Sequence, residues 1–156
     1  EVYRQLNGFD ATFFAHQEEI DLCWRAFNAG FISKYNPKSV VYHVGGATLK
    51  EGNPMKTYLN FRNSLLNVVK NVPKKWFLIV VLSRLILDGI AGIKFLLELR
   101  PIHTIAILKA HLSFYKNLPL FLKKRRKIIK KQTYFTHISI VWQYFVLGKK
   151  KFQELD

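Results

Sequence analysis

The chain has 156 residues, enough for one modest domain with a hydrophobic core but not for two large domains. A single cysteine, Cys23, excludes an internal disulfide framework and argues against a structural zinc site. The formal net charge is +15 although 49% of the residues are hydrophobic. Because the sequence opens at Glu1 rather than at a methionine, we expect it to be part of a longer protein.

The positive charge is concentrated in the second half. Residues 1–70 hold 8 Lys/Arg against 6 Asp/Glu, whereas residues 71–156 hold 17 against 4. The second half is also the more apolar one. A basic and polar composition is typical of nucleic-acid binding, but a basic composition with long apolar runs favours an anionic membrane surface. We therefore expect a membrane partner and no nucleic acid, with an internal boundary near residues 71–73.

The first elements indicate a piece of an α/β domain. Residues 7–10 (NGFD) are typical of a turn. A helix is expected from about Gln17, ending at Gly30, which stands where a helix C-terminal glycine is favoured. Residues 39–44 (SVVYHV) are rich in β-branched and aromatic residues and predict a strand. The apolar positions of the predicted helix are Ile20, Cys23, Trp24 and Phe27.

Helices are expected after this segment. Residues 54–71 place Tyr58, Phe61, Leu65 and Val69 on one apolar face. Residues 77–97 approach the ~20 apolar residues of a membrane span. Four charges interrupt this run on one stripe of the helix, which favours an interfacial helix over a true span. These charges are Arg84, Asp88, Lys94 and Glu98.

The remaining chain alternates apolar and basic segments. Residues 102–122 predict another helix, broken at Pro119. Residues 123–131 (KKRRKIIKK) hold seven basic residues in nine, and an aromatic-rich segment, 134–147, follows. This alternation is typical of the cytoplasmic face of a membrane. We therefore expect residues 76–156 to be a mainly α-helical, membrane-associated region.

Three carboxylates gather where the first long helix is expected to start: Glu18, Glu19 and Asp21. One explanation is structural, because the helix dipole favours acids in the first turn by about 0.3–1 kcal/mol each. The other is catalytic. The acids follow an apolar approach that contains Phe9, Phe13 and Phe14, which indicates a buried wall beside a general base.

A resemblance to a known family covers about residues 1–65. The runs GFDATFFAHQEEIDLCWR, VYHVGGATL and YLNFRN resemble the acceptor-side segment of family 2 glycosyltransferases of the GT-A fold. The similarity is greatest to the rhamnosyltransferase-like members that build bacterial surface polysaccharides. The resemblance implies that residues 1–49 are the C-terminal, acceptor-side part of an α/β GT-A catalytic domain. Residues 50–75 would then form a connecting helix to the membrane-associated region 76–156.

The resemblance also implies residue roles. Glu19 matches the catalytic base, with Glu18 as the alternative, and Asp21 matches a position that supports the base or the acceptor. His43 matches a ligand of the divalent metal, Mn²⁺ or Mg²⁺, beside the donor diphosphate. The positions expected to contact substrate are Asp10, Trp24, Arg25 and Arg62.

The implied activity is an inverting transfer of a sugar from a nucleotide-sugar to a lipid-linked or polysaccharide acceptor at the cytoplasmic face of the cell membrane. The sequence holds no Asp-x-Asp motif, which the family uses to bind the metal. We therefore expect the nucleotide-binding half to lie upstream of Glu1, and the 156 residues alone to be inactive. The alternative is a non-catalytic basic module that binds or scaffolds at a membrane.

Overall fold

The computed structural model describes residues 1–42, 49, 52–125, 134, 135, 137 and 139–155, and all regular structure in them is helical. Three 3₁₀ turns, Ala11–Phe13, Lys74–Trp76 and Phe152–Glu154, accompany the helices. The α-helices are α1 (Val2–Gln5), α2 (Glu18–Asn28), α3 (Pro54–Asn71), α4 (Phe77–Leu97), α5 (Pro101–Lys123) and α6 (Ile140–Phe145).

The α/β expectation is wrong for the described part of the chain, which is all-helical. Residues 39–42 of the predicted strand carry no strand structure, and residues 43 and 44 lie outside the described residues. The physical reason is that β-propensity becomes a strand only where a neighbouring strand accepts and donates the ladder hydrogen bonds. Within the described residues no such neighbour exists.

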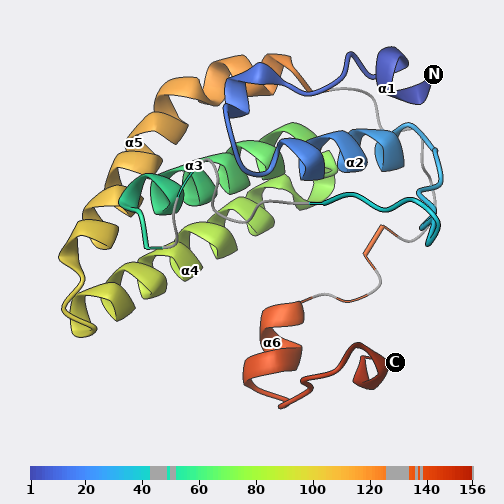
Figure 1. Cartoon of the computed structure of the whole chain (residues 1–156). Helices are drawn as coiled ribbons and strands as arrows, with labels where there is room; N and C mark the ends of the chain where they lie inside the picture. Colours follow the sequence, from blue (N-terminus) through green and yellow to red (C-terminus); the bar gives the residue numbers. More distant parts are fainter. Residues whose placement is uncertain (43–48, 50–51, 126–133, 136, 138, 156) are drawn as a thin grey trace.

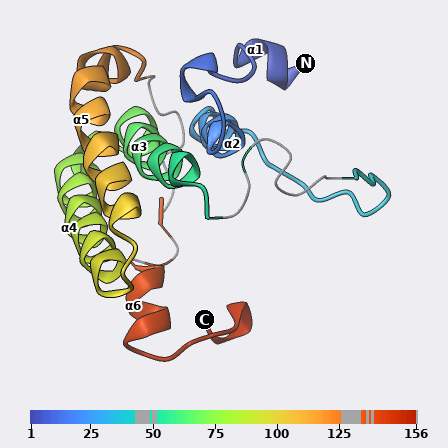
Figure 2. The same cartoon turned by 60° about the vertical axis from the view of Figure 1, so that its left-hand side comes forward.

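Helix α3 is the centre of the fold. It packs most extensively against α5, then against α4 and α2, and α4 and α5 form an antiparallel pair along its other side (Figures 1 and 2). Helix α6 and the C-terminal residues stand apart from these helices in Figure 1. We expected residues 50–75 only to connect the first region to the membrane-associated one, but α3 packs against helices from both.

The hydrophobic core lies where α3 meets α5 and the 3₁₀ turn that precedes α2. Partly buried side chains from α4 and α5 pack around it. Burying each large apolar side chain contributes about 1.5–3 kcal/mol relative to leaving it exposed. The core residues are Phe13, Leu65, Leu66, Val69, Phe114 and Phe121.

Two helices follow their sequence signals closely. Helix α3 begins after Asn53, whose side-chain Oδ1 accepts from the backbone N–H of Met55 at 2.8 Å, with Pro54 in its first turn. Helix α2 ends at Gly30, where φ is +89°. There the N–H of Gly30 donates to Phe27 O and the N–H of Phe31 donates to Ala26 O, the bonds of a Schellman cap. Both predictions of helix position are confirmed.

Helix α5 differs from its prediction at Pro119. It runs without a break from Pro101 to Lys123, and its ribbon bends towards the amino-terminal segment near its end (Figure 1). Pro119 lacks the N–H that a helix interior uses, and its ring crowds the carbonyl four residues earlier. Phe114 and Phe121 pack into the core on either side of Pro119, and this packing keeps the last turns helical despite the cost.

Of the four charged residues expected on one stripe of α4, only some pack against the rest of the protein. Asp88 is buried, with Arg84 Nε 2.8 Å from one carboxylate oxygen and His111 Nε2 of α5 3.1 Å from the other. Lys94 and Glu98 pair at 3.6 Å in the exposed part of the helix. Arg84 lies over the ring of Phe61 of α3 and Asp88 meets His111 of α5, which leaves many apolar side chains of α4 on the outside.

Candidate functional site

The segment that leads into the acidic cluster has an unusual backbone. Phe14, His16 and Gln17 all have positive φ, at +66°, +66° and +74°. Non-glycine residues rarely adopt this region, and each such residue costs about 1–3 kcal/mol unless the surroundings hold it in place. Strained positions of this kind cluster at functional sites, and here three of them lie within four residues directly before Glu18. We refer to residues 14–19 as the acidic turn.

Helix α3 holds the acidic turn from one side. The side-chain amide Nδ2 of Asn63 donates to the carbonyl oxygens of Phe13, Ala15 and His16 at 3.0, 2.8 and 2.7 Å. An amide has two hydrogens, so at least one of them is shared between two carbonyls.

Two other residues of α3, Arg62 and Asn67, also hold the acidic turn. Arg62 Nη2 donates to Phe13 O at 3.0 Å, and Asn67 Nδ2 donates to Gln17 O at 3.3 Å. Arg62 Nε also donates to Asn63 Oδ1 at 2.8 Å, which fixes the orientation of that amide. The clamp therefore consists of Arg62, Asn63 and Asn67.

Asp21 lies at the junction of α2 and α3 and is completely buried. Its Oδ2 accepts from Arg25 Nε at 2.7 Å and from Lys70 Nζ at 2.9 Å, and its Oδ1 accepts from Asn71 Nδ2 at 2.9 Å. Arg25 also donates to the carbonyl oxygens of Leu6 and Gly8. Asp21 is therefore saturated by its own protein and joins α2, α3 and the N-terminal segment.

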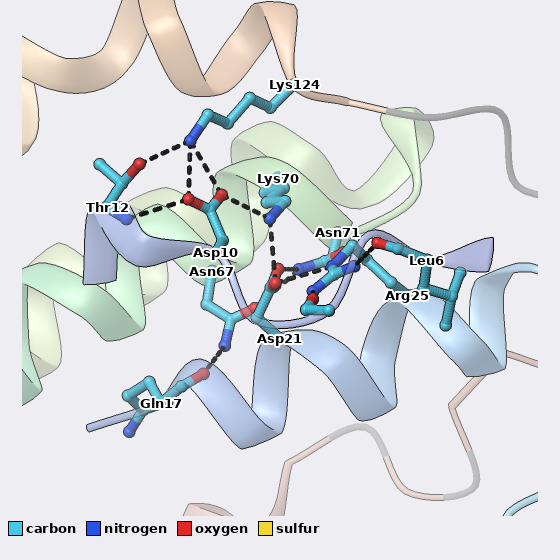
Figure 3. Close-up of polar contacts among 11 residues, drawn as sticks. Leu6, Asp10, Thr12, Gln17, Asp21, Arg25, Asn67, Lys70, Asn71 and Lys124 are labelled. Atoms are coloured by element: carbon cyan, nitrogen blue, oxygen red, sulfur yellow. Dashed lines mark hydrogen bonds and ion pairs between the residues drawn. The ribbon is translucent and has the colours of Figure 1, made fainter. Parts of the chain in front are cut away.

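A chain of alternating charges continues from Asp21 to α5 (Figure 3). Lys70 Nζ bridges Asp21 and Asp10, and lies 2.8 Å from Asp10 Oδ2. Lys124 Nζ donates to both oxygens of Asp10 and to the hydroxyl of Thr12. Burial alone would raise the pKa of the Asp10 carboxyl, but the hydrogen bonds from Lys124, Lys70 and Thr12 outweigh it and lower that pKa well below its usual range.

The two glutamates of the cluster lie differently. Glu19 is exposed, whereas Glu18 is partly buried and its Oε2 has no hydrogen-bond partner within the described residues. His16 Nε2 is likewise buried and unpartnered there. Buried polar atoms without partners are rare in folded proteins, and each calls for an explanation such as a catalytic role or a bound molecule. The acidic turn thus offers one solvent-facing carboxylate and two unsatisfied polar atoms.

The other residues singled out in the sequence are placed as follows. Trp24 Nε1 donates to the hydroxyl of Tyr134, so the polar edge of the indole is occupied within the protein. Of the predicted apolar positions of α2, Ile20 and Cys23 are exposed. The buried side chains on this helix are instead Asp21, Arg25 and Asn28.

The aromatic approach to the acids is also only partly buried. Phe13 is in the core, but Phe9 and Phe14 are exposed. The expected buried wall therefore consists of Phe13 alone among these three.

The described residues contain no group of three or more His, Cys, Asp or Glu side chains that could hold a metal ion. They do not fit a divalent metal site by themselves. His43, the predicted ligand, lies outside the described residues. The metal expectation therefore stays a prediction, and no chemical step below passes through a metal.

Sequence reasoning missed most of the α3 residues that hold the acidic turn and Asp21. Arg62 was singled out for a substrate contact, but Asn63, Asn67 and Lys70 on the same helix were not. All three are buried. A signal was present: four polar residues, at 63, 67, 70 and 71, recur at helical spacing beside the apolar face of α3, which gives that helix a second, polar buried face.

Comparisons of the chain with protein-family models, with curated proteins and with solved structures find no match.

Proposed function

We propose that the acidic turn is the acceptor-side base of an inverting glycosyltransferase. The observation that carries the proposal is the strained segment 14–17, clamped by α3, which fixes Glu18 and Glu19 at the start of α2. Holding a base in one geometry lowers the entropic cost of reaching the transition state. A purely dipole-stabilised pair of acids needs neither the strain nor the clamp.

The proposed step is a single displacement. An acceptor hydroxyl oxygen attacks the anomeric carbon of a nucleotide-sugar, and the bond from that carbon to the diphosphate oxygen breaks. The nucleoside diphosphate leaves with the bonding electron pair, and the hydroxyl proton passes to a glutamate carboxylate. Glu19 matches the base by resemblance, while the unpartnered Oε2 of Glu18 gives the alternative a structural basis.

We expect the change Glu19→Gln to lower the rate of sugar transfer by about 10²–10⁴-fold, which is the usual contribution of a general base. Membranes that contain the natural protein are incubated with a panel of radiolabelled nucleotide-sugars, and transfer to lipid and polysaccharide fractions is counted. The matched variant Glu18→Gln identifies which carboxylate acts, because the base is the one whose loss abolishes transfer. Undiminished transfer by a variant carrying both changes would overturn the proposal.

We further propose that the enzyme works on a membrane surface through α4 and α5. Among the described residues one helix, Lys74–Leu97, is long and apolar enough to cross a bilayer, and only 11% of its most apolar window is buried. A soluble core helix of this composition would be mostly buried. Large exposed apolar patches mark interaction surfaces. The exposed side chains of α4 include Leu78, Ile79, Leu82, Ile86, Ile90 and Ile93, and those of α5 include Ile102, Ile105, Leu108 and Leu112.

We expect Ile86→Asp to weaken binding to lipid vesicles at least tenfold, because a carboxylate near the middle of an inserted apolar helix costs about 2.5–3.5 kcal/mol. Ile86 is exposed, so the change leaves the core intact. The control is Ile32→Asp, the same change at an exposed isoleucine outside α4. Binding is measured by co-flotation with vesicles. Equal losses in the two variants would contradict membrane docking by α4.

The same apolar surface favours a second candidate, a non-catalytic module that binds membranes. This candidate assigns the acidic turn a structural role only. It predicts that a variant carrying Glu18→Gln and Glu19→Gln keeps full vesicle binding and that the unchanged protein transfers no sugar from any donor. The transfer assay above therefore separates the two candidates.

A further inference from the structure

A cavity separate from the acidic turn lies between the N-terminal segment and the end of α5. Its volume is about 490 Å³. It is lined by residues 6–11, by the buried Arg25 of α2 and Lys70 of α3, and by residues 123–125 at the end of α5. Part of this arrangement is visible in Figure 3, where Lys124, directly after α5, reaches across to Asp10. Three parts of the chain that are far apart in sequence therefore build one hollow.

The cavity lining is strongly cationic. Among the described lining residues, the cations are Arg25, Lys70, Lys123, Lys124 and Arg125, and the one carboxylate is Asp10. Counting also the buried Asp21, which pairs with two of these cations, five positive charges face two negative charges. The surplus is three positive charges. A surplus of positive charge in a concave site attracts anions and raises their local concentration.

The cations are held in place rather than free to swing into solvent. Arg25 and Lys70 are more than nine-tenths buried. Arg125 donates to the carbonyl oxygens of Val69 and Val72, which are neutral acceptors and do not balance its charge. Burial lowers the pKa of Arg125, so its charged form is penalised by lost hydration. An anion in the cavity would offset that penalty.

Lys123 supplies the most accessible charge. It is exposed, lines the cavity, and has no acidic partner among the described residues. It follows Leu120 and Leu122, which are exposed apolar side chains on the last turns of α5. An exposed ammonium together with fixed guanidinium and ammonium groups is an arrangement suited to a phosphate, since Lys and Arg are the usual ligands of phosphate oxygens.

We propose that this cavity binds a phosphate or diphosphate group, presented either by a lipid headgroup or by a soluble phosphate ester. The cavity is larger than a bare phosphate needs and therefore also admits part of the group to which the phosphate is attached. The proposal does not depend on sugar transfer. Binding is measured with no donor or acceptor present.

The test is titration of the full chain, in neutral detergent, with inorganic pyrophosphate by calorimetry. We expect Lys123→Gln to weaken binding about five-fold, the effect of about 1 kcal/mol for one lysine near a phosphate surface. The matched control is Lys109→Gln, an exposed lysine about 20 Å away along α5 at 1.5 Å per residue. It should leave the affinity within two-fold.

Asp10→Asn supplies a test with the opposite sign. It removes the one carboxylate among the described residues that line the cavity. Lys124 then loses its acidic partner and Lys70 keeps only Asp21, so pyrophosphate binding should become tighter by a similar factor. General damage to the fold would weaken binding instead. No measurable binding of pyrophosphate, equal losses for Lys123→Gln and Lys109→Gln, or weaker binding by a folded Asp10→Asn variant would each overturn the proposal.

A second arm distinguishes the source of the phosphate. Vesicles of phosphatidylcholine alone and of phosphatidylcholine with phosphatidic acid are added to the protein. If phosphatidic acid vesicles bind more tightly and release pyrophosphate, the site takes a lipid phosphate. If pyrophosphate binds and these vesicles do not displace it, the site takes a soluble phosphate ester. Both results support the site and differ only in its occupant.

Discussion

Replacing Asp21 with alanine is expected to lower the free energy of unfolding by about 3–5 kcal/mol, the usual cost of removing one partner from a buried ion pair. Asp21 is fully buried and accepts from Arg25, Lys70 and Asn71. Without it, two buried cations lose a countercharge and an amide loses its acceptor. Urea unfolding in neutral detergent, followed by tryptophan fluorescence, measures the change.

The matched control for Asp21 is Glu19→Ala, which removes one carboxylate from the same turn of α2 at an exposed position. It should change stability by no more than about 0.5 kcal/mol, as most surface substitutions do. If Asp21→Ala were as mild as the control, the charge chain through Lys70 to Asp10 would not hold α2 against α3. The assignment of Asp21 as the junction of these helices would then be wrong.

The second large effect is expected for Asn63→Leu, a change of similar volume that removes the amide. The buried carbonyl oxygen of Phe13 and the partly buried ones of Ala15 and His16 lose the hydrogen bonds that Asn63 donates, and an unsatisfied carbonyl costs up to about 1–3 kcal/mol when it is fully buried. We expect a loss of about 2–4 kcal/mol in the free energy of unfolding. Because the positive-φ segment then loses the central residue of its clamp, sugar transfer by the natural protein should fall as well.

A control on the same helix separates the clamp from a general effect of replacing asparagine. Asn60 is half-buried on α3, and within the described residues it makes no hydrogen bond to the acidic turn. Asn60→Leu should therefore leave both stability and transfer near their original values. Unchanged unfolding of Asn63→Leu would mean that residues 14–17 keep their conformation without α3, which contradicts the proposed clamp.

The sequence predicted where helices begin and end because those signals are local. Asn53 and Pro54 start α3, Gly30 ends α2, and the apolar run 77–97 coincides with α4. Caps and glycine conformations act over four or five residues, so they can be read from neighbours in the chain. The strand predicted from residue 39 is absent from residues 39–42, because a strand requires hydrogen-bond partners that the local sequence does not supply.

The sequence predicted the acidic residues of the candidate site, but not the α3 residues that hold them in place. Glu18, Glu19 and Asp21 were identified by their spacing, yet hydropathy places an aspartate on the surface. Asp21 is instead the most buried charge on α2, because Lys70 and Asn71 meet it from positions 49 and 50 residues later. Helical spacing marks a polar face on α3, but nothing in the local sequence of either helix shows that this face is buried against Asp21.

The long helices, the acidic cluster and the concentration of positive and apolar residues in the second half can all be read from the order of the residues. The folded chain was needed to show that α2 buries a polar face, that Asn63 holds a strained turn, and that residues 123–125 line a cationic cavity together with residues 6–11. The two sets of features differ in the sequence separation of the residues that produce them. Helix formation depends on neighbours a few residues apart, whereas burial of a charge depends on which distant group compensates it in the folded chain.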